Sequence, residues 1–285
     1  MLKSVNTGNS WTSVGGGRIG TADIYAIEAL DANTALVTTT PSTTSYLFRT
    51  TNGGTTWDTV YVQVGGFLDA INMFDANNGI ALGDPLGGKW TIVKTSNGGA
   101  TWIRDTVNAP VQVGTEAGAN NGLFSRNSST IWFTSNSTPP KVYRTTNGGT
   151  TWASSTLPYS DTFVAGIAFN TAGYGVVSGN SGNVARSTDG GVTWASVTVG
   201  TTGAAYAASA SGVDFFVTKG ANVYRSTDRG ATWTTSWTGT ISTLEHCSFA
   251  SVGTTTRGWV IGSAGGIGAF YGALTGVEEE AVGIP

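Results

Sequence analysis

The stretch RTTNGGTTW at residues 49–57 recurs letter for letter at residues 144–152. Looser copies begin with lysine or arginine and have Asn or Asp fourth, glycine sixth and tryptophan ninth. They are KSVNTGNSW (3–11), KTSNGGATW (94–102), RSTDGGVTW (186–194) and RSTDRGATW (225–233). We call this nine-residue motif the box. Its closing tryptophans lie 46, 45, 50, 42 and 39 residues apart, a period that predicts a repeat architecture.

The residue types of the box predict a tight turn. An Asx side chain accepts backbone N–H groups, and glycine adopts the positive φ that other residues adopt only at a cost. Each tryptophan is expected to pack over its hairpin, where burial contributes about 1.5–3 kcal/mol. We therefore assign a structural role to Asn6, Trp11, Asn52, Trp57, Asn97, Trp102, Asn147, Trp152, Asp189, Trp194, Asp228 and Trp233.

The segments between boxes repeat one order of strands. In the first full unit they are residues 22–30, 34–40, 45–50 and 55–62, separated by Asn, Gly, Asp and Pro, with no helical period. Four more such units follow, and the third unit of the chain has only a weak first strand near residues 114–124. A sixth unit has strands at 243–249, 257–263 and 267–274, and it ends without a box.

Five complete units and one split unit predict an all-β fold, a six-bladed β-propeller of four-stranded antiparallel blades over residues 1–274. The strand at residues 10–14 would close the last blade, because an open array leaves two unpaired sheet edges. Either Leu2–Ser4 or Ile267–Leu274 would supply the third strand of that blade. Seven blades are the alternative.

Composition limits the classes of function. Of the 285 residues 11% are charged and the net charge is −3, so no basic excess supports nucleic-acid binding. Ten tryptophans argue against disorder, and no run of 18 apolar residues predicts a membrane-spanning helix. Cys247 is the only cysteine, which excludes an internal disulfide, and we interpret it as a buried apolar residue.

The pattern Ser/Thr-x-Asp/Asn-x-Gly-x-Thr-Trp is the Asp box, and residues 3–274 resemble the Asp-box or BNR-repeat propellers. That superfamily includes sialidases, other glycosidases, sorting receptors and photosystem II assembly factors. The segments 73–85 and 169–191 are most similar to the assembly-factor branch and its bacterial secreted relatives. The resemblance implies the fold and leaves the activity open.

The tail TGVEEEAVGIP at residues 275–285 departs from the repeat, and its three consecutive glutamates predict a solvated linker. It resembles the junction before the C-terminal sorting domain of type IX secretion cargo in Bacteroidetes-like bacteria. The resemblance implies a protein that is secreted or held on the outer surface of a Gram-negative cell, with the sorting domain beyond this sequence.

Catalysis would need residues that converge. A sialidase needs three converging arginines, but the box arginines belong to different blades; GRIGT at 17–21 is similar to the sialidase Arg-Ile-Pro element without its proline. Other glycosidases use two carboxylates in one cleft. Acids of the inner strands are expected to line a solvated channel mouth: Asp23, Asp69, Glu116, Asp161 and Glu245. A glycoside hydrolase is therefore the second hypothesis.

A binding module is the first hypothesis. Its candidate ligand-binding residues are Asp69, Glu116 and Glu245 with the adjacent His246, and the tryptophans Trp90 and Trp237, which are better candidates for exposure than Trp132 and Trp259. No His/Cys cluster predicts a metal, although the loop at 75–79 could hold Ca²⁺. We expect a monomer without a cofactor that binds a protein or a glycan, or an assembly factor for a membrane complex.

Overall fold

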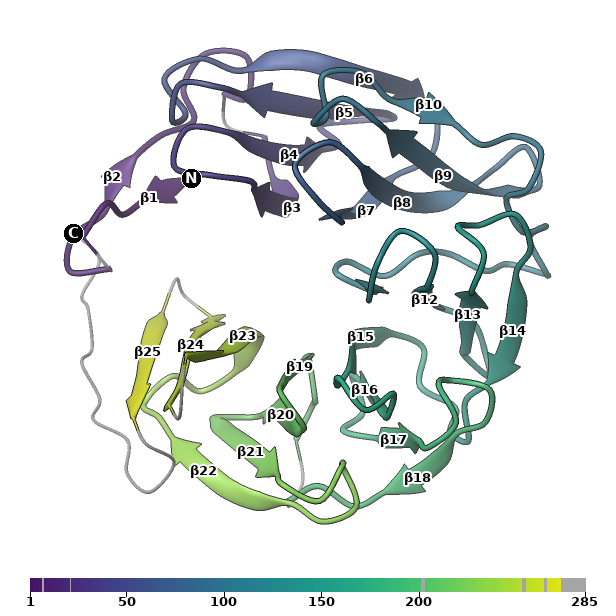
Figure 1. Cartoon of the computed structure of the whole chain (residues 1–285), viewed down its shortest axis with the longest axis vertical. Helices are drawn as coiled ribbons and strands as arrows, with labels where there is room; N and C mark the ends of the chain where they lie inside the picture. Colours follow the sequence, from purple (N-terminus) through teal and green to yellow (C-terminus); the bar gives the residue numbers. More distant parts are fainter. Residues whose placement is uncertain (7, 21, 201–202, 253–254, 264–265, 273–285) are drawn as a thin grey trace. The chain divides into compact units, whose positions relative to one another are not determined.

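Each sequence repeat forms one antiparallel sheet (Figure 1). The computed structural model describes residues 1–285 except 7, 21, 201–202, 253–254, 264–265 and 273–285. The described residues form 25 strands and no α-helix, so they contain no helix long and apolar enough to cross a membrane. The chain divides into two compact units, residues 1–137 with 143–154 and residues 138–142 with 155–285.

Unit 1 contains two complete four-stranded sheets, and the strands of the first follow the predicted ranges closely. The first sheet consists of β3 (Ile24–Ala29), β4 (Ala35–Thr39), β5 (Thr44–Thr50) and β6 (Asp58–Val64). The second consists of β7 (Leu68–Met73), β8 (Gly79–Leu86), β9 (Lys89–Thr95) and β10 (Ile103–Arg104). In both sheets the chain turns through a box between the third and the fourth strand.

The third sheet contains the division between the units. It consists of β11 (Leu123–Ser125), β12 (Ile131–Ser135), β13 (Lys141–Thr145) and β14 (Ala153–Thr156). The first strand was expected near 114–124, but β11 is shorter and begins later. The stretch AGANNG before it is rich in residues that favour turns, and residues 117 and 136 pair there only as an isolated bridge.

Unit 2 contains the next three sheets. The fourth consists of β15 (Val164–Phe169), β16 (Gly175–Gly179), β17 (Val184–Ser187) and β18 (Ala195–Val197). The fifth consists of β19 (Ala207–Ser211), β20 (Asp214–Lys219), β21 (Asn222–Ser226) and β22 (Thr234–Thr238). The sixth has three strands, β23 (Leu244–Val252), β24 (Thr255–Gly262) and β25 (Ile267–Gly272).

The ends of the repeat array answer one of the open questions. β25 pairs with β24, so residues 267–272 supply the third strand of the sixth sheet. At the N-terminus β1 (Leu2–Lys3) pairs with β2 (Thr12–Ser13) across the first box as a two-stranded sheet. Closure of the last blade by the N-terminal strand, and with it the number of blades, stays a prediction. The tail at 275–285 lies outside the described residues.

Neighbouring sheets within a unit pack face to face. On β8, Ile80 and Leu82 belong to the core shared with the third sheet, whereas Ala81 between them belongs to the core shared with the first sheet. Successive side chains of a strand point to opposite faces, so a strand between two sheets is apolar on both. The first strands lie side by side, β3 with β7 and β7 with β11 in unit 1, and β15 with β19 and β19 with β23 in unit 2.

Candidate functional site

A cavity of about 770 Å³ lies in unit 1, on the first sheet and the segment before it. Its wall combines aromatic rings, hydroxyl groups, one guanidinium and one carboxylate. The described residues that line it are Arg18, Ile19, Ala22, Asp23, Tyr25, Thr39, Thr40, Pro41, Tyr46, Phe48 and Thr59. Sequence reasoning had singled out GRIGT at 17–21 for its arginine, but it did not place the aromatic residues beside it.

The aromatic part of the wall comes from β5 and β3. Tyr46 and Phe48 are two residues apart on β5 and therefore lie on one face of the sheet, with ring centroids 5.8 Å apart and planes within 17° of parallel. Tyr25 on β3 is held edge-on by Phe67, with centroids 4.3 Å apart. Phe48 is buried, whereas Tyr25 and Tyr46 are partly exposed to the cavity. These rings offer apolar faces on which a flat ligand can stack.

The polar part of the wall has unused hydrogen-bonding capacity. Arg18 is exposed, and its guanidinium makes only a long hydrogen bond, 3.5 Å from Nη1 to Thr59 Oγ1. The hydroxyl of Thr39 is buried without a hydrogen-bond partner, a state that is unfavourable in a folded protein. Thr40 Oγ1, in contrast, lies 2.9 Å from Ser45 Oγ. A polar ligand in the cavity could pair with the exposed Arg18 guanidinium, whereas the Thr39 hydroxyl, on a side chain that is 0% exposed, is out of its reach.

Asp69 was expected to line a solvated channel mouth, and this interpretation is wrong because the residue is only 3% exposed. Burial raises the pKa of Asp69 well above its usual range, and the charge of Asp84 raises it further. Asp84 Oδ1 accepts a hydrogen bond from the backbone N–H of Gly118 at 2.6 Å. A Cβ at Gly118 would collide with the Asp69 carboxyl. Both acids are thus packed around one glycine.

Glu116 and Trp90 come together through a residue that sequence reasoning missed. Glu116 is 1% exposed, and its Oε2 accepts hydrogen bonds from Tyr143 Oη at 2.7 Å and from Val113 N at 3.0 Å. The Tyr143 ring lies 5.5 Å from that of Trp90, which is 0% exposed. Burial and the Glu116 hydrogen bond raise the pKa of Tyr143. The expectations of a solvated Glu116 and an exposed Trp90 are therefore wrong.

The candidate residues of unit 2 divide into buried and exposed. Trp237 is 9% exposed and packs in the core with Leu244 and Val260, so the expectation that it is exposed is also wrong. Asp161 is buried and accepts hydrogen bonds from Ser181 N and Asn183 Nδ2. The sequence around Trp237 and Asp161 does not show whether either side chain is buried or exposed.

Glu245 is exposed, as expected for an acid of a solvated channel mouth, and His246 beside it is exposed as well. Both lie on β23, where the register with β24 shifts between Leu244 and His246. Such a shift breaks the strict alternation of faces along a strand, so two neighbouring side chains can both reach solvent. Their part in ligand binding stays a prediction.

The boxes have the predicted turn geometry. In the first full box, Asn52 Oδ1 accepts hydrogen bonds from Thr56 N at 2.9 Å and Thr50 Oγ1 at 3.0 Å, and Thr50 Oγ1 accepts one from Gly54 N. Positive φ occurs at the sixth position of every box: Gly8, Gly54, Gly99, Gly149, Gly191 and Gly230.

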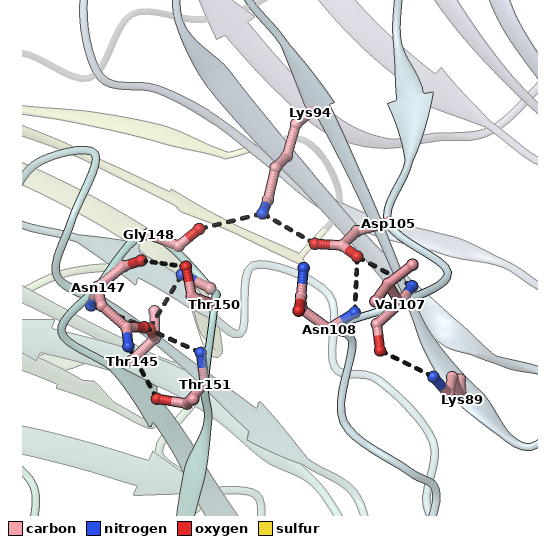
Figure 2. A network of polar contacts seen from close by, with 11 residues as sticks. Lys89, Lys94, Asp105, Val107, Asn108, Thr145, Asn147, Gly148, Thr150 and Thr151 are labelled. Carbon is pink, nitrogen blue, oxygen red and sulfur yellow. Dashed lines mark hydrogen bonds and ion pairs between the residues drawn. The ribbon is translucent and has the colours of Figure 1, made fainter.

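The first box position has a role that sequence reasoning missed. Lys94 Nζ donates to the Gly148 carbonyl in the box of the next sheet at 3.0 Å and pairs with Asp105 at 3.0 Å (Figure 2). Arg49 Nε donates to the Gly98 carbonyl at 2.8 Å in the same way. Lys94 and Arg49 thus join neighbouring sheets, and the recurrence of Lys or Arg at the first box position was the available signal.

The loop at 75–79 uses its carboxylate for its own turn. Asp75 Oδ1 accepts hydrogen bonds from Asn77 N at 2.7 Å and Asn78 N at 2.8 Å. The hydrogen bonds from Asn78, side chain and then backbone, lower the pKa of Asp75 most. Over the described part of the chain no three His, Cys, Asp or Glu residues form a group that could hold a metal ion. Calcium at this loop stays untested.

No protein-family model matches the sequence, and no curated protein matches it. Solved structures do. YCF48 bound to a D1 peptide has a TM-score of 0.62 at 14% identity over 91% of this chain and 81% of that one. A streptogramin B lyase gives 0.68 at 13% identity over 92% and 84%. The GH74 xyloglucanase of Xanthomonas campestris gives 0.63 at 12% identity over 98% of this chain and 46% of that one.

These likenesses establish the fold. All are far below the identity at which activity is inherited, and they include enzymes as well as YCF48. Together with the repeated antiparallel sheets, they show that this chain has an all-β, β-propeller fold.

Proposed function

We propose that this chain is a non-catalytic binding module that recognises a glycan through the cavity of unit 1. It would act as a monomer that is secreted or held on the surface of a Gram-negative cell, as the tail implies. The observation that carries the proposal is the wall of the cavity, where partly exposed Tyr25 and Tyr46 adjoin the exposed side chains of Arg18 and Asp23.

The chemistry of this wall matches that of a sugar. A pyranose ring has an apolar face that stacks on an aromatic ring and a rim of hydroxyl groups that exchange hydrogen bonds. The guanidinium of Arg18 supplies several donors, and the carboxylate of Asp23 supplies acceptors. The cavity volume lies within the usual range of 300–1,000 Å³ for small-molecule sites.

The placement of the acids supports binding without hydrolysis. Glycoside hydrolases position two carboxyl groups on either side of the bond that is cleaved. Among the described residues that line the cavity, Asp23 is the one carboxylate. Asp69 and Glu116, the other two acids of unit 1 that the sequence suggests as candidates, are buried in hydrogen-bonded or packed surroundings.

A glycan array followed by calorimetric titration tests the proposal. The chain should bind a defined class of oligosaccharide, and Tyr46→Ala or Arg18→Gln should weaken binding roughly tenfold or more, since each removes a stacking face or a charged donor. Arg257→Gln is the matched control, because Arg257 is exposed on β24 in unit 2. Failure of the whole array to bind, or hydrolysis of aryl glycosides that Asp23→Asn abolishes, would overturn the proposal.

An assembly factor is the second candidate, and YCF48 bound to a D1 peptide favours it. In that case a protein partner, rather than a sugar, would occupy the binding surface. A pull-down from membranes with the purified chain should then recover one partner at a fixed ratio, and added oligosaccharide should not release it. Recovery of no partner would contradict this candidate.

A further inference from the structure

Two guanidinium groups gather around one tyrosine ring in unit 2. Tyr174 lies directly before β16, Arg186 lies on β17, and Arg229 lies in the box after β21. The Arg186 and Arg229 guanidinium carbons are 5.4 and 5.0 Å from the centre of the Tyr174 ring. Arg229 Nη1 also donates to Tyr174 Oη at 3.0 Å, and Arg186 Nε donates to the Arg229 carbonyl at 2.6 Å.

Neither arginine has an acidic partner among the described residues of the chain. The contrast within the same unit is Arg225, whose Nε and Nη2 both donate to Asp214 Oδ2. The nearest acids in sequence are Asp189 for Arg186 and Asp228 for Arg229, and each uses its carboxylate to accept hydrogen bonds within its own box turn. Two positive charges therefore share one ring without a neutralising carboxylate, although like charges repel.

The backbone of Arg229 has a conformation that is unfavourable for a residue with a side chain. Its φ is 64°, in the left-handed region that a residue with a side chain rarely adopts. The same box position is glycine, with φ between 68° and 73°, at Gly53, Gly98, Gly148 and Gly190. Glycine would fit there without strain, so the strained arginine points to a use for its side chain.

The donors that remain free face no partner within the described residues. Arg186 uses Nε and keeps both terminal nitrogens, whereas Arg229 uses Nη1 and keeps Nε and Nη2. A planar guanidinium with two free N–H groups on one edge is suited to bind a carboxylate through two parallel hydrogen bonds.

We propose that Tyr174, Arg186 and Arg229 form a docking site for an acidic segment of a protein partner. Aspartate or glutamate side chains of that segment would pair with the free edges of the two guanidinium groups. A protein is favoured over a small anion because Arg229 is exposed on a box turn and Tyr174 is half-buried, and tyrosine and arginine are the residues that dominate protein interfaces. This site is separate in residues and in chemistry from the cavity of unit 1.

Fluorescence anisotropy with a labelled hexaglutamate peptide tests the proposal. The chain should bind the peptide, and 0.5 M salt should weaken the affinity as expected for charge pairing. Arg229→Gly should reduce the affinity roughly tenfold or more, the equivalent of losing one charge-assisted contact. Because glycine is the residue of the other boxes, this variant should fold at least as stably, which a thermal melt checks. Arg186→Gln should weaken binding similarly.

The controls separate this site from general attraction to cations. Arg257→Gln removes one exposed charge of the same unit and should change the affinity less than twofold. Unchanged peptide binding by Arg229→Gly, or an equal loss in Arg257→Gln, would overturn the site. A polygalacturonate oligosaccharide that binds to these arginines more tightly than the peptide would overturn the choice of a protein partner.

Discussion

The boxes of the third and fifth sheets share one backbone and present two different surfaces. In each, the fifth residue has a left-handed conformation, with φ 68° at Gly148 and 64° at Arg229. In each, the carbonyl of that residue accepts a hydrogen bond from the box cation of the preceding sheet, Lys94 at 3.0 Å (Figure 2) and Arg186 at 2.6 Å. The turn therefore fixes the carbonyl and leaves the side chain free to vary.

The charges around the two boxes differ. Lys94 pairs with Asp105, so the contact at Gly148 is locally neutral. Arg186 has no such acid, and Arg229 adds a second guanidinium over Tyr174. The same hydrogen bond between a box cation and the next box thus lies in neutral surroundings at Gly148 and beside two positive charges at Arg229. The difference shows how a repeat can acquire a binding surface at one copy without changing its fold.

The largest effect is expected from removing the side chain that builds each turn. Asp228 accepts hydrogen bonds from Ala231 N, Thr232 N and Thr232 Oγ1, and charge strengthens them, so Asp228→Ala should cost about 2 kcal/mol of unfolding free energy. Asn147 makes neutral bonds to Thr151, and Asn147→Ala should cost about 1 kcal/mol. Urea unfolding measures both. Equal losses would show that the charge of the fifth-sheet box adds nothing.

Exchanging the fifth residue of the box, Gly148 in the third sheet and Arg229 in the fifth, should have the next largest effect on the free energy of unfolding. Gly148→Arg should lower the unfolding free energy by about 1–2 kcal/mol, because the left-handed conformation strains any side chain and a Cβ would lie 3.3 Å from the Ser128 carbonyl oxygen. Arg229→Gly should have the opposite sign and a size of about 1 kcal/mol or less. Thermal melts of the two variants check the signs. A destabilised Arg229→Gly would mean that its contacts with Tyr174 outweigh the strain.

Removing the hydrogen bond that Lys94 makes to the next sheet should have a moderate effect on the free energy of unfolding. Lys94→Met removes the bond to Gly148 and the ion pair with Asp105, and it should cost about 1 kcal/mol. Lys89→Met is the matched control on the same strand, since Lys89 donates to the Thr106 and Val107 carbonyls in an exposed position. Its cost in urea unfolding should be smaller. If Lys89→Met lowered the free energy of unfolding as much as Lys94→Met, the contact of Lys94 with Gly148 would have no special role in stability.

The repeat made the fold predictable, because each box combines an Asx side chain, a glycine and a tryptophan whose roles are local. The strand positions of the first full unit followed from the same punctuation, whereas β11 begins later than expected, because the residues from 114 onward combine weak strand formers with turn formers. The pairing of residues 267–272 with β24 was one of two alternatives, and neither could be chosen from local pattern alone.

The candidate site was less predictable because burial depends on which sheets meet. The sequence makes Trp90 a candidate for exposure and Glu116 a candidate for a solvated channel mouth, but both are buried and are linked by Tyr143. The sequence around Tyr143 does not show that its hydroxyl reaches Glu116, 27 residues away. Likewise, Arg186 and Arg229 meet over Tyr174 only because two boxes lie side by side in unit 2.

The smallest expected effect is on the dependence of stability on pH. Burial raises the pKa of Asp189, but hydrogen bonds from Thr193 outweigh it and lower the pKa to about 2, and the hydrogen bonds from Thr232 lower the pKa of Asp228. Their usual value in an unfolded chain is about 3.9, so their stabilisation is complete above that pH and is lost as the pH falls toward the folded values. Both groups are exposed, and solvent screening keeps the effect small.

The double variant Asp189→Asn, Asp228→Asn makes these boxes like that of Asn147, and its melting temperature should fall less than that of the wild type between pH 5 and about pH 2. An identical acid profile would show that the two carboxylates carry no charge-dependent share of the stability, and the boxes would then differ in surface alone.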